Sequence, residues 1–534
     1  MTRVADTIAQ RLAEAGCRHA FGIPGGEVLA MMQALDAAGL KFTLCRHENA
    51  GGFMAEGAWH ATDAPGVLLA TIGPGVVNAV NVIANALQDR VPLIVLTGCV
   101  DALEAETYTH QVFDHQAVLR PLVKASFKAA PDTAGIIADK AIAIALDGQP
   151  GPVHIDIPIG AAEAEMTGPV PRRTRPAPVA PPPGPDFDRA VSLIRAAQRP
   201  LVIAGVDAVT EHAGDAVAVF CRHLSAPLIT TYKAKGLIDE RDPLSLGGHG
   251  LSPKSDVILK PLLAETDLIM LAGYDPIEMR PGWRDPWPEG TEVIEIAAVP
   301  NTHYMHQATL AFTAAVGPTL DLLRGATDAK TGWPDNRPAE IRQALADAFT
   351  APSSWGPHQV FDTLRQNLPQ DTVITADSGA HRILLSQMWP CYTPRSLLQS
   401  SALCTMGCAV PLAAGHAIAA PDTPICAFIG DAGLEMTLGE LATLREERLP
   451  VLVVVLVDDS LALIELKQRN AQRPNLGVDF TGSDLPAVAR ALGGHGAWID
   501  DTETLRAEAI AAFDRDTFTL LACRIGRRAY DGTF

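Results

Sequence analysis

The sequence predicts an α/β fold made of three doubly wound, parallel-sheet domains. Short apolar runs without alternation recur along the 534 residues, which is typical of strands buried on both faces of a parallel sheet. Helical stretches separate these runs, as in successive βαβ units. Two segments poor in such runs interrupt the pattern, and a length of 534 residues suits about three to four domains.

The domains are expected in a simple order along the chain. The first covers residues 1–165, and a stiff proline-rich linker follows at 166–187. The middle domain covers 188–326, a second linker 327–355, and the third domain 356–534. The predicted strands of the first two domains are His19–Gly22, Val67–Thr71, Leu93–Thr97, Val153–Ile157, Leu201–Ala204, Leu228–Thr231, Leu268–Leu271 and Val293–Ile296.

Composition excludes several classes of function. A net charge of −19 argues against nucleic acid or an anionic membrane as a partner. The nine cysteines are odd in number and lack paired CxxC spacing, so we expect reduced thiols and a cytoplasmic protein. No run approaches the roughly 18 apolar residues of a membrane span. Charges interrupt the amphipathic N-terminal helix, which is therefore not expected to be a signal peptide.

The most informative stretch runs from residue 425 to 467. A strand ends in Gly430-Asp431-Ala432-Gly433, small residues that let the backbone approach an anion. A helix over Glu440–Glu447 and a buried strand over Val451–Val457 follow, and Asp458 comes next. Because strands of one βαβ unit end at the same sheet edge, Asp431 and Asp458 are expected to lie together. Two carboxylates beside a phosphate group suit Mg²⁺.

This stretch resembles the thiamine-diphosphate signature of the acetolactate synthase family, in which G-D-[GA] is followed by a helix, LPV, an apolar strand and two Asn. The resemblance implies thiamine diphosphate and Mg²⁺ as cofactors. The implied metal ligands are Asp431, Asp458 and the backbone carbonyl of Ser460, and further cofactor contacts are Ala432, Gly433, Leu461, Ala462 and Leu463. Val457-Asp458 replaces the Asn pair, so the site gains a negative charge that faces the diphosphate.

A second motif is His47-Glu48, which opens a helix. A carboxylate at this position can simply complement the helix dipole. The motif is also similar to HE-x-x-A of the same family, with Gly51 in place of the Ala. In that family the Glu bonds ring nitrogen N1′ of the aminopyrimidine and favours the imino form, whose nitrogen removes the proton from thiazolium C2. The resemblance therefore makes Glu48 the first candidate for a catalytic residue.

Two more loops of the first domain carry family positions. The resemblance places Gly26 above the thiazolium ring, and the lack of an acidic residue there favours carbon–carbon ligation over simple decarboxylation. It also makes Pro74 and Asn78, in the TIGPGVVN segment, cofactor contacts, and it places Gln111 near the substrate. His115 remains open as a site histidine or an ordinary satisfied one.

The third domain adds a segment close to the family's GTMG, with Cys404 in place of the first Gly. The resemblance implies that Met406 props the cofactor into a bent shape, and that the backbone of Cys404 and Met406 bonds its pyrimidine. A core filler is the commoner role of a Met. Lys467 takes the place of a family Trp or Gln, where an ammonium could pair with an acidic group of the substrate or simply reach solvent.

The function expected first is a carboligase of the acetolactate synthase type, which decarboxylates a 2-oxo acid such as pyruvate and joins the two-carbon unit to a second carbonyl. The alternatives are a decarboxylase or C–C lyase for another, possibly dianionic substrate, and a catalytically impaired regulatory protein. Gly273–Pro281 resembles flavin-free members, so FAD is expected to be absent. The family pairs the first domain of one subunit with the third of another, which implies a homodimer or homotetramer with interfacial active sites.

Overall fold

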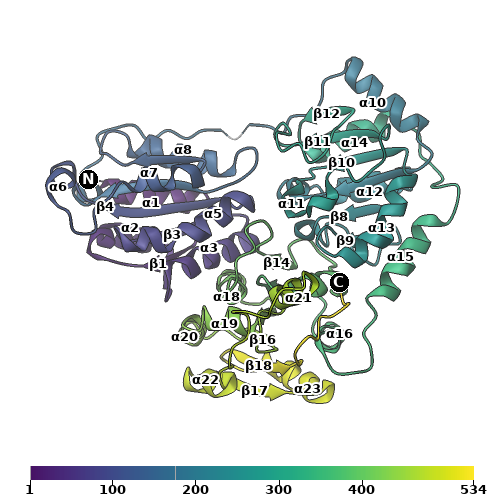
Figure 1. Cartoon of the computed structure of the whole chain (residues 1–534). Coiled ribbons are helices and arrows are strands. Elements are labelled where there is room, and N and C mark those ends of the chain that lie inside the picture. The colour runs from purple at the N-terminus through teal and green to yellow at the C-terminus, as the bar shows by residue number, and fades with distance from the viewer. Residues whose placement is uncertain (1, 175) are drawn as a thin grey trace.

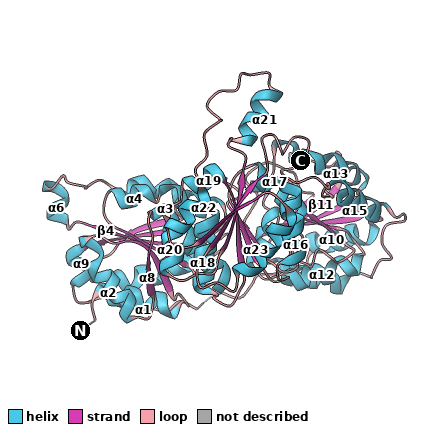
Figure 2. Ribbon diagram, turned by 90° about the horizontal axis from the view of Figure 1, so that it is seen from below, coloured by secondary structure: helices cyan, strands magenta, loops and turns pink. Residues whose placement is uncertain are grey.

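The structure is a computed structural model that describes residues 2–174 and 176–534. It contains three six-stranded sheets whose paired strands are parallel throughout the described residues, and Figure 1 shows them as three bodies along the chain. Helices flank the strands in each body (Figure 2). The predicted α/β class and the three parallel sheets are therefore confirmed.

The first sheet has the order β2-β1-β3-β4-β6-β5. Its strands are β1 (His19–Ile23), β2 (Lys41–Leu44), β3 (Gly66–Ala70), β4 (Leu93–Cys99), β5 (Ala125–Lys128) and β6 (Val153–Pro158). The helices are α1 (Val4–Glu14), α2 (Leu29–Ala37), α3 (Glu48–Thr62), α4 (Pro74–Asn78), α5 (Val80–Gln88), α6 (Ala102–Thr107), α7 (His115–Leu119), α8 (Ala134–Leu146) and α9 (Ile159–Glu163), with 3-10 turns η1 (Gly26–Val28) and η2 (Arg120–Leu122).

The middle sheet has a different order, β12-β11-β10-β7-β8-β9. Its strands are β7 (Pro200–Ala204), β8 (Leu228–Thr230), β9 (Ser245–Gly248), β10 (Leu268–Ala272), β11 (Glu292–Ala297) and β12 (Leu310–Thr313). The helices are α10 (Pro185–Ala196), α11 (Val206–Thr210), α12 (Gly214–Leu224), α13 (Pro253–Glu265), α14 (Val316–Ala326) and α15 (Arg337–Ala348), with η3 (Tyr232–Ala234), η4 (Pro276–Glu278) and η5 (Pro281–Trp283). Helix α15 lies within the 327–355 segment and packs Ile341 and Leu345 into the middle core.

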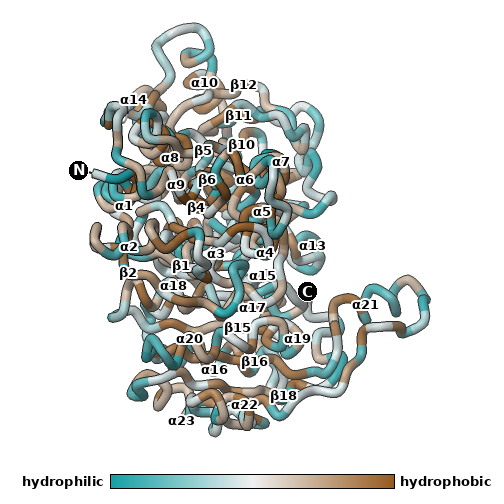
Figure 3. The backbone as a smooth tube through the Cα atoms, turned by 90° about the vertical axis from the view of Figure 1, so that its left-hand side faces the viewer, coloured by the Kyte–Doolittle hydropathy of each residue, from teal (hydrophilic) through white to brown (hydrophobic). Residues whose placement is uncertain are grey.

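The third sheet, β14-β13-β15-β16-β18-β17, repeats the strand order of the first. Its strands are β13 (Val373–Ala376), β14 (Leu397–Gln399), β15 (Ile425–Gly430), β16 (Leu452–Val457), β17 (His495–Ile499) and β18 (Thr519–Arg524). The helices are α16 (Pro357–Asn367), α17 (Ala380–Met388), α18 (Ala409–Ala419), α19 (Asp431–Glu435), α20 (Glu440–Glu446), α21 (Ala462–Asn470), α22 (Leu485–Ala491) and α23 (Thr502–Ala512). The hydropathy view shows α21 on an arm that projects from this domain (Figure 3).

Helices α3 and α18 join the first and third domains through one continuous apolar core. Glycines permit their close approach, because a Cβ at Gly415 would lie 1.8 Å from the carbonyl oxygen of Met54 and one at Gly57 would lie 2.2 Å from that of Leu412. Glu48 begins α3, so this contact fixes the position of the candidate acid relative to the third domain. No helix within the described residues is both long enough and apolar enough to cross a membrane.

Candidate active site

Asp431 and Asp458 meet at the carboxyl edge of the third sheet, as predicted. Asp431 follows β15, and its Oδ2 accepts the backbone N–H groups of Asp458 at 3.1 Å and Asp459 at 2.9 Å. The N–H of Ser460 in turn donates to Oδ1 of Asp458 over 3.2 Å. Ser460 is buried, and its hydroxyl donates to Asp479 over 3.0 Å. The structure therefore brings all three predicted metal ligands into one loop cluster.

The electrostatics of this cluster favour a bound cation. Burial raises the pKa of the Asp431 carboxyl, although hydrogen bonds from backbone N–H groups oppose the rise. Burial and then the nearby charge of Asp431 raise the pKa of Asp458 to about 8. The two groups are 4% and 7% exposed, so their negative charges are poorly solvated and a divalent ion would stabilise the ionised forms. The all-oxygen donor set suits a hard ion such as Mg²⁺, so the residues fit the implied group.

Asp377 connects the acidic cluster to the segment around Met406. It follows β13, and its Oδ2 accepts the N–H of Gly407 over 2.8 Å while Oδ1 lies 2.9 Å from Nε2 of His381. A side chain at Gly433 would collide with the same Oδ2, at 2.1 Å from its Cβ, so this predicted contact residue has to be small. Asp377 was not among the predicted site residues, although it stands after a strand at the switch point of the sheet, which is a usual ligand position.

The backbone at Cys404 has a conformation that favours Gly. Cys404 is exposed and has φ of +56°, in the left-handed region that costs an L-residue about 1–2 kcal/mol. Its thiol donates to the carbonyl of Ser401 over 3.2 Å, and Arg382 donates to its sulfur over 3.3 Å. Met406, two residues on, is half-buried. The position of Met406 therefore leaves part of its side chain available for contact.

Glu48 occupies the first turn of α3 with its carboxylate held from one side. The side-chain amide of Asn78 donates to Oε2 of Glu48 over 3.0 Å, and Glu48 is 5% exposed. Gly75 lies close to the other oxygen, because a Cβ there would be 3.3 Å from Oε1. Pro74 and Asn78, the first and last residues of α4, are exposed. The structure thus gathers Glu48, Pro74 and Asn78 at one spot.

Gln111 lies against the same loop. Its φ is +60°, and its carbonyl oxygen would be 2.7 Å from a Cβ at Gly73. His115 is buried behind the loop, where its Nε2 accepts the N–H of Gly73 at 3.2 Å and its Nδ1 lies 2.9 Å from Asp156. His115 is therefore a satisfied structural histidine that fixes the loop. Gly26 is exposed, with open space where a side chain would stand.

Two contacts between domains bring the first turn of α3 alongside the third domain. Oε1 of Glu440 accepts the backbone N–H groups of Arg46 at 2.9 Å and His47 at 3.1 Å. Asn81 donates to Asn49 at 3.1 Å and to the hydroxyl of Thr405 at 3.2 Å. Sequence reasoning placed Glu440 in a helix and gave it no role, since partners 393 and 394 residues away leave no local signal.

The remaining predicted contacts lie at the start of the projecting α21. Leu461, Ala462 and Leu463 are half-buried, next to Ser460, while Lys467 one turn further is exposed. Within the described residues, no hydrogen bond or ion pair joins Glu48 to the Asp431–Asp458 pair. The candidate site of one chain thus consists of two groups, one at Glu48 and one at Asp431.

Comparisons with known proteins identify the three bodies. Residues 2–118 match the thiamine pyrophosphate enzyme N-terminal TPP binding domain, 187–323 the central domain, and 377–523 the C-terminal TPP binding domain. An acetolactate synthase large subunit of Parasynechococcus marenigrum is 31% identical over 97% of this chain and 87% of that protein.

Two further relatives carry different activities in their names. The acetolactate synthase of Bacillus subtilis is 27% identical over 94% of this chain and 90% of its own length. The probable 2-ketoarginine decarboxylase AruI of Pseudomonas aeruginosa is 28% identical over 97% of this chain and 93% of its own length. The three matched domains and the near full-length similarity agree with the site geometry, and the chain belongs to the thiamine-diphosphate-dependent enzymes of the acetolactate synthase family.

Proposed function

We propose that this enzyme is a Mg²⁺-dependent carboligase of the acetolactate synthase type, which decarboxylates a 2-oxo acid such as pyruvate and joins the two-carbon unit to a second carbonyl. The observation that carries the proposal is the pair of preformed groups: a buried Glu48 held by Asn78, and a buried Asp431–Asp458 pair at the edge of another sheet. Relatives named acetolactate synthase support the choice of reaction.

The roles of the residues follow from their contacts. Thiamine diphosphate, when bound, supplies an electron sink for decarboxylation. Glu48 would hold a proton at the ring nitrogen of the cofactor, and Asn78 fixes the direction of that carboxyl group. Asp431, Asp458 and the backbone carbonyl of Ser460 would hold Mg²⁺, which would offset the negative charge of the diphosphate. Asp377 holds the loop of Met406 in place through Gly407.

Gly26 bears on the fate of the decarboxylated unit. An acidic side chain at this position would be able to deliver a proton and release an aldehyde. The open space at Gly26 offers no such proton, which favours addition to a second carbonyl compound. The exposed Gln111, beside Gly73, is a candidate to contact the substrate.

A second candidate function is decarboxylation of another 2-oxo acid without ligation. This function is favoured by the similarity to the probable 2-ketoarginine decarboxylase. That protein is 28% identical to this chain, while the Bacillus subtilis acetolactate synthase is 27% identical. The exposed ammonium of Lys467 would suit a substrate with a second acidic group. Replacement Lys467→Gln would then weaken use of a dianionic 2-oxo acid and spare pyruvate.

The assembly that we propose is a homodimer or homotetramer with active sites between subunits. Exposed apolar side chains flank both halves of the site: Val77 is 53% exposed, Met436 68% and Leu476 76%. Apolar groups gathered at a functional face are typical of a surface that another chain covers. All nine cysteines have free thiols, which suits the reducing cytoplasm. The proposal includes no flavin.

Product analysis tests the function. The purified protein, with Mg²⁺ and thiamine diphosphate, is offered pyruvate and other 2-oxo acids, with and without aldehyde acceptors, and CO₂ and organic products are measured. We expect acetolactate from pyruvate. Aldehyde as the sole product would support the decarboxylase instead, and no CO₂ from any 2-oxo acid would overturn both candidates.

A further inference from the structure

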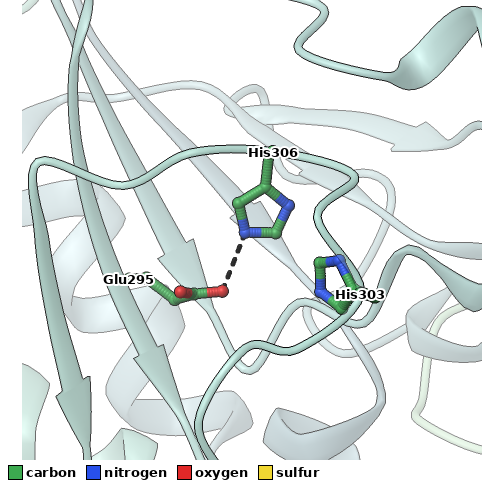
Figure 4. A group of neighbouring side chains, drawn as sticks. All are labelled: Glu295, His303 and His306. Carbon is green, nitrogen blue, oxygen red and sulfur yellow. Dashed lines mark hydrogen bonds and ion pairs between the residues drawn. The ribbon is translucent and has the colours of Figure 1, made fainter.

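A carboxylate and two imidazoles form a cluster in the middle domain, apart from the site described above. Glu295 stands near the end of β11, while His303 and His306 belong to the loop between β11 and β12. One potential ligand atom from each side chain lies within 4.8 Å of the other two. Figure 4 shows the ring of His306 between the carboxylate of Glu295 and the ring of His303.

The buried carboxylate of Glu295 lowers the stability of the fold unless a positive charge lies beside it. It is 3% exposed, and its register partners on the neighbouring strands are Leu271 and Ala311. A buried carboxylate without compensation is strongly unfavourable. Its carboxylate contacts Nε2 of His306 at 2.8 Å. A protonated imidazole or a metal ion at this point would offset the negative charge.

His306 presents one ring nitrogen to Glu295. The residue is 2% exposed, with the rings of Tyr274 and Trp287 at centroid distances of 5.4 Å and 5.9 Å. Its Nε2 faces Glu295 and also the side-chain amide of Asn301 at 3.2 Å. Because this edge of the ring faces the carboxylate, Nε2 is the nitrogen that would bind an ion shared with Glu295.

His303 provides access from solvent. Its side chain is exposed, its ring lies 5.0 Å from that of His306, and its Nδ1 accepts the N–H of Met305 over 3.0 Å. Imidazole nitrogen is the commonest metal ligand among protein side chains, and an exposed ring can reach an ion that arrives from solvent.

We propose that Glu295, His303 and His306 bind a divalent transition-metal ion of the Zn²⁺ type. One carboxylate and two imidazoles are a donor set that zinc accepts with a position left for water, whereas Mg²⁺ prefers oxygen ligands alone. Zinc–ligand bonds of about 2.0–2.2 Å require ligand atoms roughly 3.3–3.5 Å apart. The 2.8 Å contact between Glu295 and His306 would therefore have to widen by roughly half an ångström. The exposed His303 would complete the set from a ligand atom that now lies within 4.8 Å of the other two.

The surroundings leave room for the remaining ligand. A pocket of about 240 Å³ adjoins the cluster and is lined by Glu295 and His303 together with Arg90, Gln149 and Asp275. Arg90 donates to Asp275 at 2.8 Å and thereby joins the first and middle domains. An ion that ties the β11–β12 loop to the sheet would rigidify this junction, so its binding is expected to raise the melting temperature.

Zinc titration of the full-length protein tests the proposal. The chelator-stripped protein is saturated with Mg²⁺ and thiamine diphosphate, so that the acidic site is occupied, and Zn²⁺ is then added in a calorimeter. The variants are His303→Ala, whose exposed position should not disturb folding, and Glu295→Gln. His212→Ala, at a middle-domain histidine with 65% side-chain exposure outside the cluster, is the matched control. Absorption of Co²⁺ added in place of Zn²⁺ reports on the ligands independently.

We expect one equivalent of Zn²⁺ bound by the wild type and by His212→Ala, with a rise in melting temperature. Both cluster variants should bind at least tenfold more weakly and should change or lose the Co²⁺ absorption. A wild type that binds no Zn²⁺ under these conditions would overturn the proposal. Equal affinity in the wild type and both cluster variants would do so as well, since the ion would then reside elsewhere.

Discussion

The side-chain amide of Asn78 donates a hydrogen bond of 3.0 Å to the carboxylate of Glu48. The two residues come from different elements, since Glu48 begins α3 and Asn78 ends α4. The bond uses one oxygen of Glu48, while the other faces the side of Gly75, where no side chain intervenes. Glu48 is thus oriented before any cofactor arrives, which reduces the reorganisation that catalysis requires.

Glu48→Gln should abolish most activity while the protein still binds the cofactor. Gln keeps an oxygen that accepts the bond from Asn78, but it cannot exchange a proton. Loss of a general acid–base group lowers kcat by about 10² to 10⁴-fold. CO₂ release from the preferred 2-oxo acid measures the effect, and calorimetry with thiamine diphosphate measures binding. The exposed Glu503→Gln is the control, and activity within a few-fold of wild type would contradict the assigned role.

Asn78→Ala should lower kcat by about tenfold, because the hydrogen bond that orients Glu48 disappears. The melting temperature should change little, because Asn78 is exposed. Asn78→Asp should be worse, since it places a second negative charge beside Glu48. Steady-state kinetics checks both variants against Asn336→Ala, at an exposed residue distant in sequence. Indistinguishable kinetics for the Ala and Asp variants would argue against an electrostatic role.

Asp458→Asn should remove a pH dependence of Mg²⁺ binding. The pKa of Asp458 is about 8, above its ordinary value, so below pH 8 the ion has to displace a proton. In the wild type the affinity should rise with pH, by up to about tenfold per unit, and level off above pH 8. Asn carries no proton to displace, so its binding curve should be flat.

The measurement is Mg²⁺ titration at several pH values with thiamine diphosphate present. Asp459→Asn is the neighbouring control, since Asp459 is exposed and contacts Asp431 through its backbone N–H. That variant should keep the wild-type slope. A slope that survives in Asp458→Asn would assign the titration to another group.

Glu56 should make the fold less stable at alkaline pH. Burial raises its pKa to about 8, and Lys233 opposes part of the rise. Because the folded state then holds the proton more tightly than the unfolded state does, the contribution of Glu56 to stability is greatest below about pH 4.5 and falls until about pH 8. Glu56→Gln keeps an acceptor for Asn85, which donates to Glu56 over 3.0 Å. It should raise stability at pH 8.5 by about 1–3 kcal/mol and change little at pH 4.5.

Thermal unfolding of Glu56→Gln at pH 4.5 and pH 8.5 checks this expectation, with the surface variant Glu503→Gln as reference. The melting temperatures of wild type and Glu56→Gln should diverge as the pH rises. A constant difference between them at both values would show that Glu56 does not titrate in this range.

Internal strands were predictable because their apolar runs are continuous. Leu93–Thr97 and Val451–Val457 were expected as strands and form the core of β4 and β16. Edge strands lack this signal. β2 (Lys41–Leu44) and β5 (Ala125–Lys128) each contain exposed or half-buried residues, since an edge strand in this fold is less completely covered. β2 and β5 form the two edges of the first sheet, and they can be assigned as strands only once the inner strands of that sheet are known.

The site was predictable where residues of one loop or one βαβ unit act together, as Asp431 and Asp458 do. It was not predictable where distant segments meet, as when Glu440 accepts hydrogen bonds from Arg46 and His47 across more than 390 residues. The left-handed backbone of Cys404 was not predictable either, because nothing in a Cys side chain indicates that conformation. Asp377 carries a sequence signal, an acid directly after an inner strand, but its contact with Gly407 depends on how the loops fold.

The two halves of the site allow a test of which chains they come from. In the proposed assembly Glu48 of one subunit and Asp431 of another serve the same cofactor. Glu48→Gln and Asp431→Asn should each inactivate the homo-oligomer. Mixed dimers would then contain one site with both defects and one intact site. Random mixing in equal amounts should restore about a quarter of wild-type activity, because half of the dimers are mixed and each has one working site.

Co-expression of the two variants with different affinity tags, followed by purification on both tags, isolates the mixed dimer and should yield about half of wild-type activity per dimer. The double variant Glu48→Gln/Asp431→Asn, co-expressed with itself, is the control and should stay inactive. Each single variant must also remain inactive alone. If the mixed dimer is as inactive as its parents, both groups belong to one chain, and the exposed apolar residues Val77 and Met436 would need another explanation.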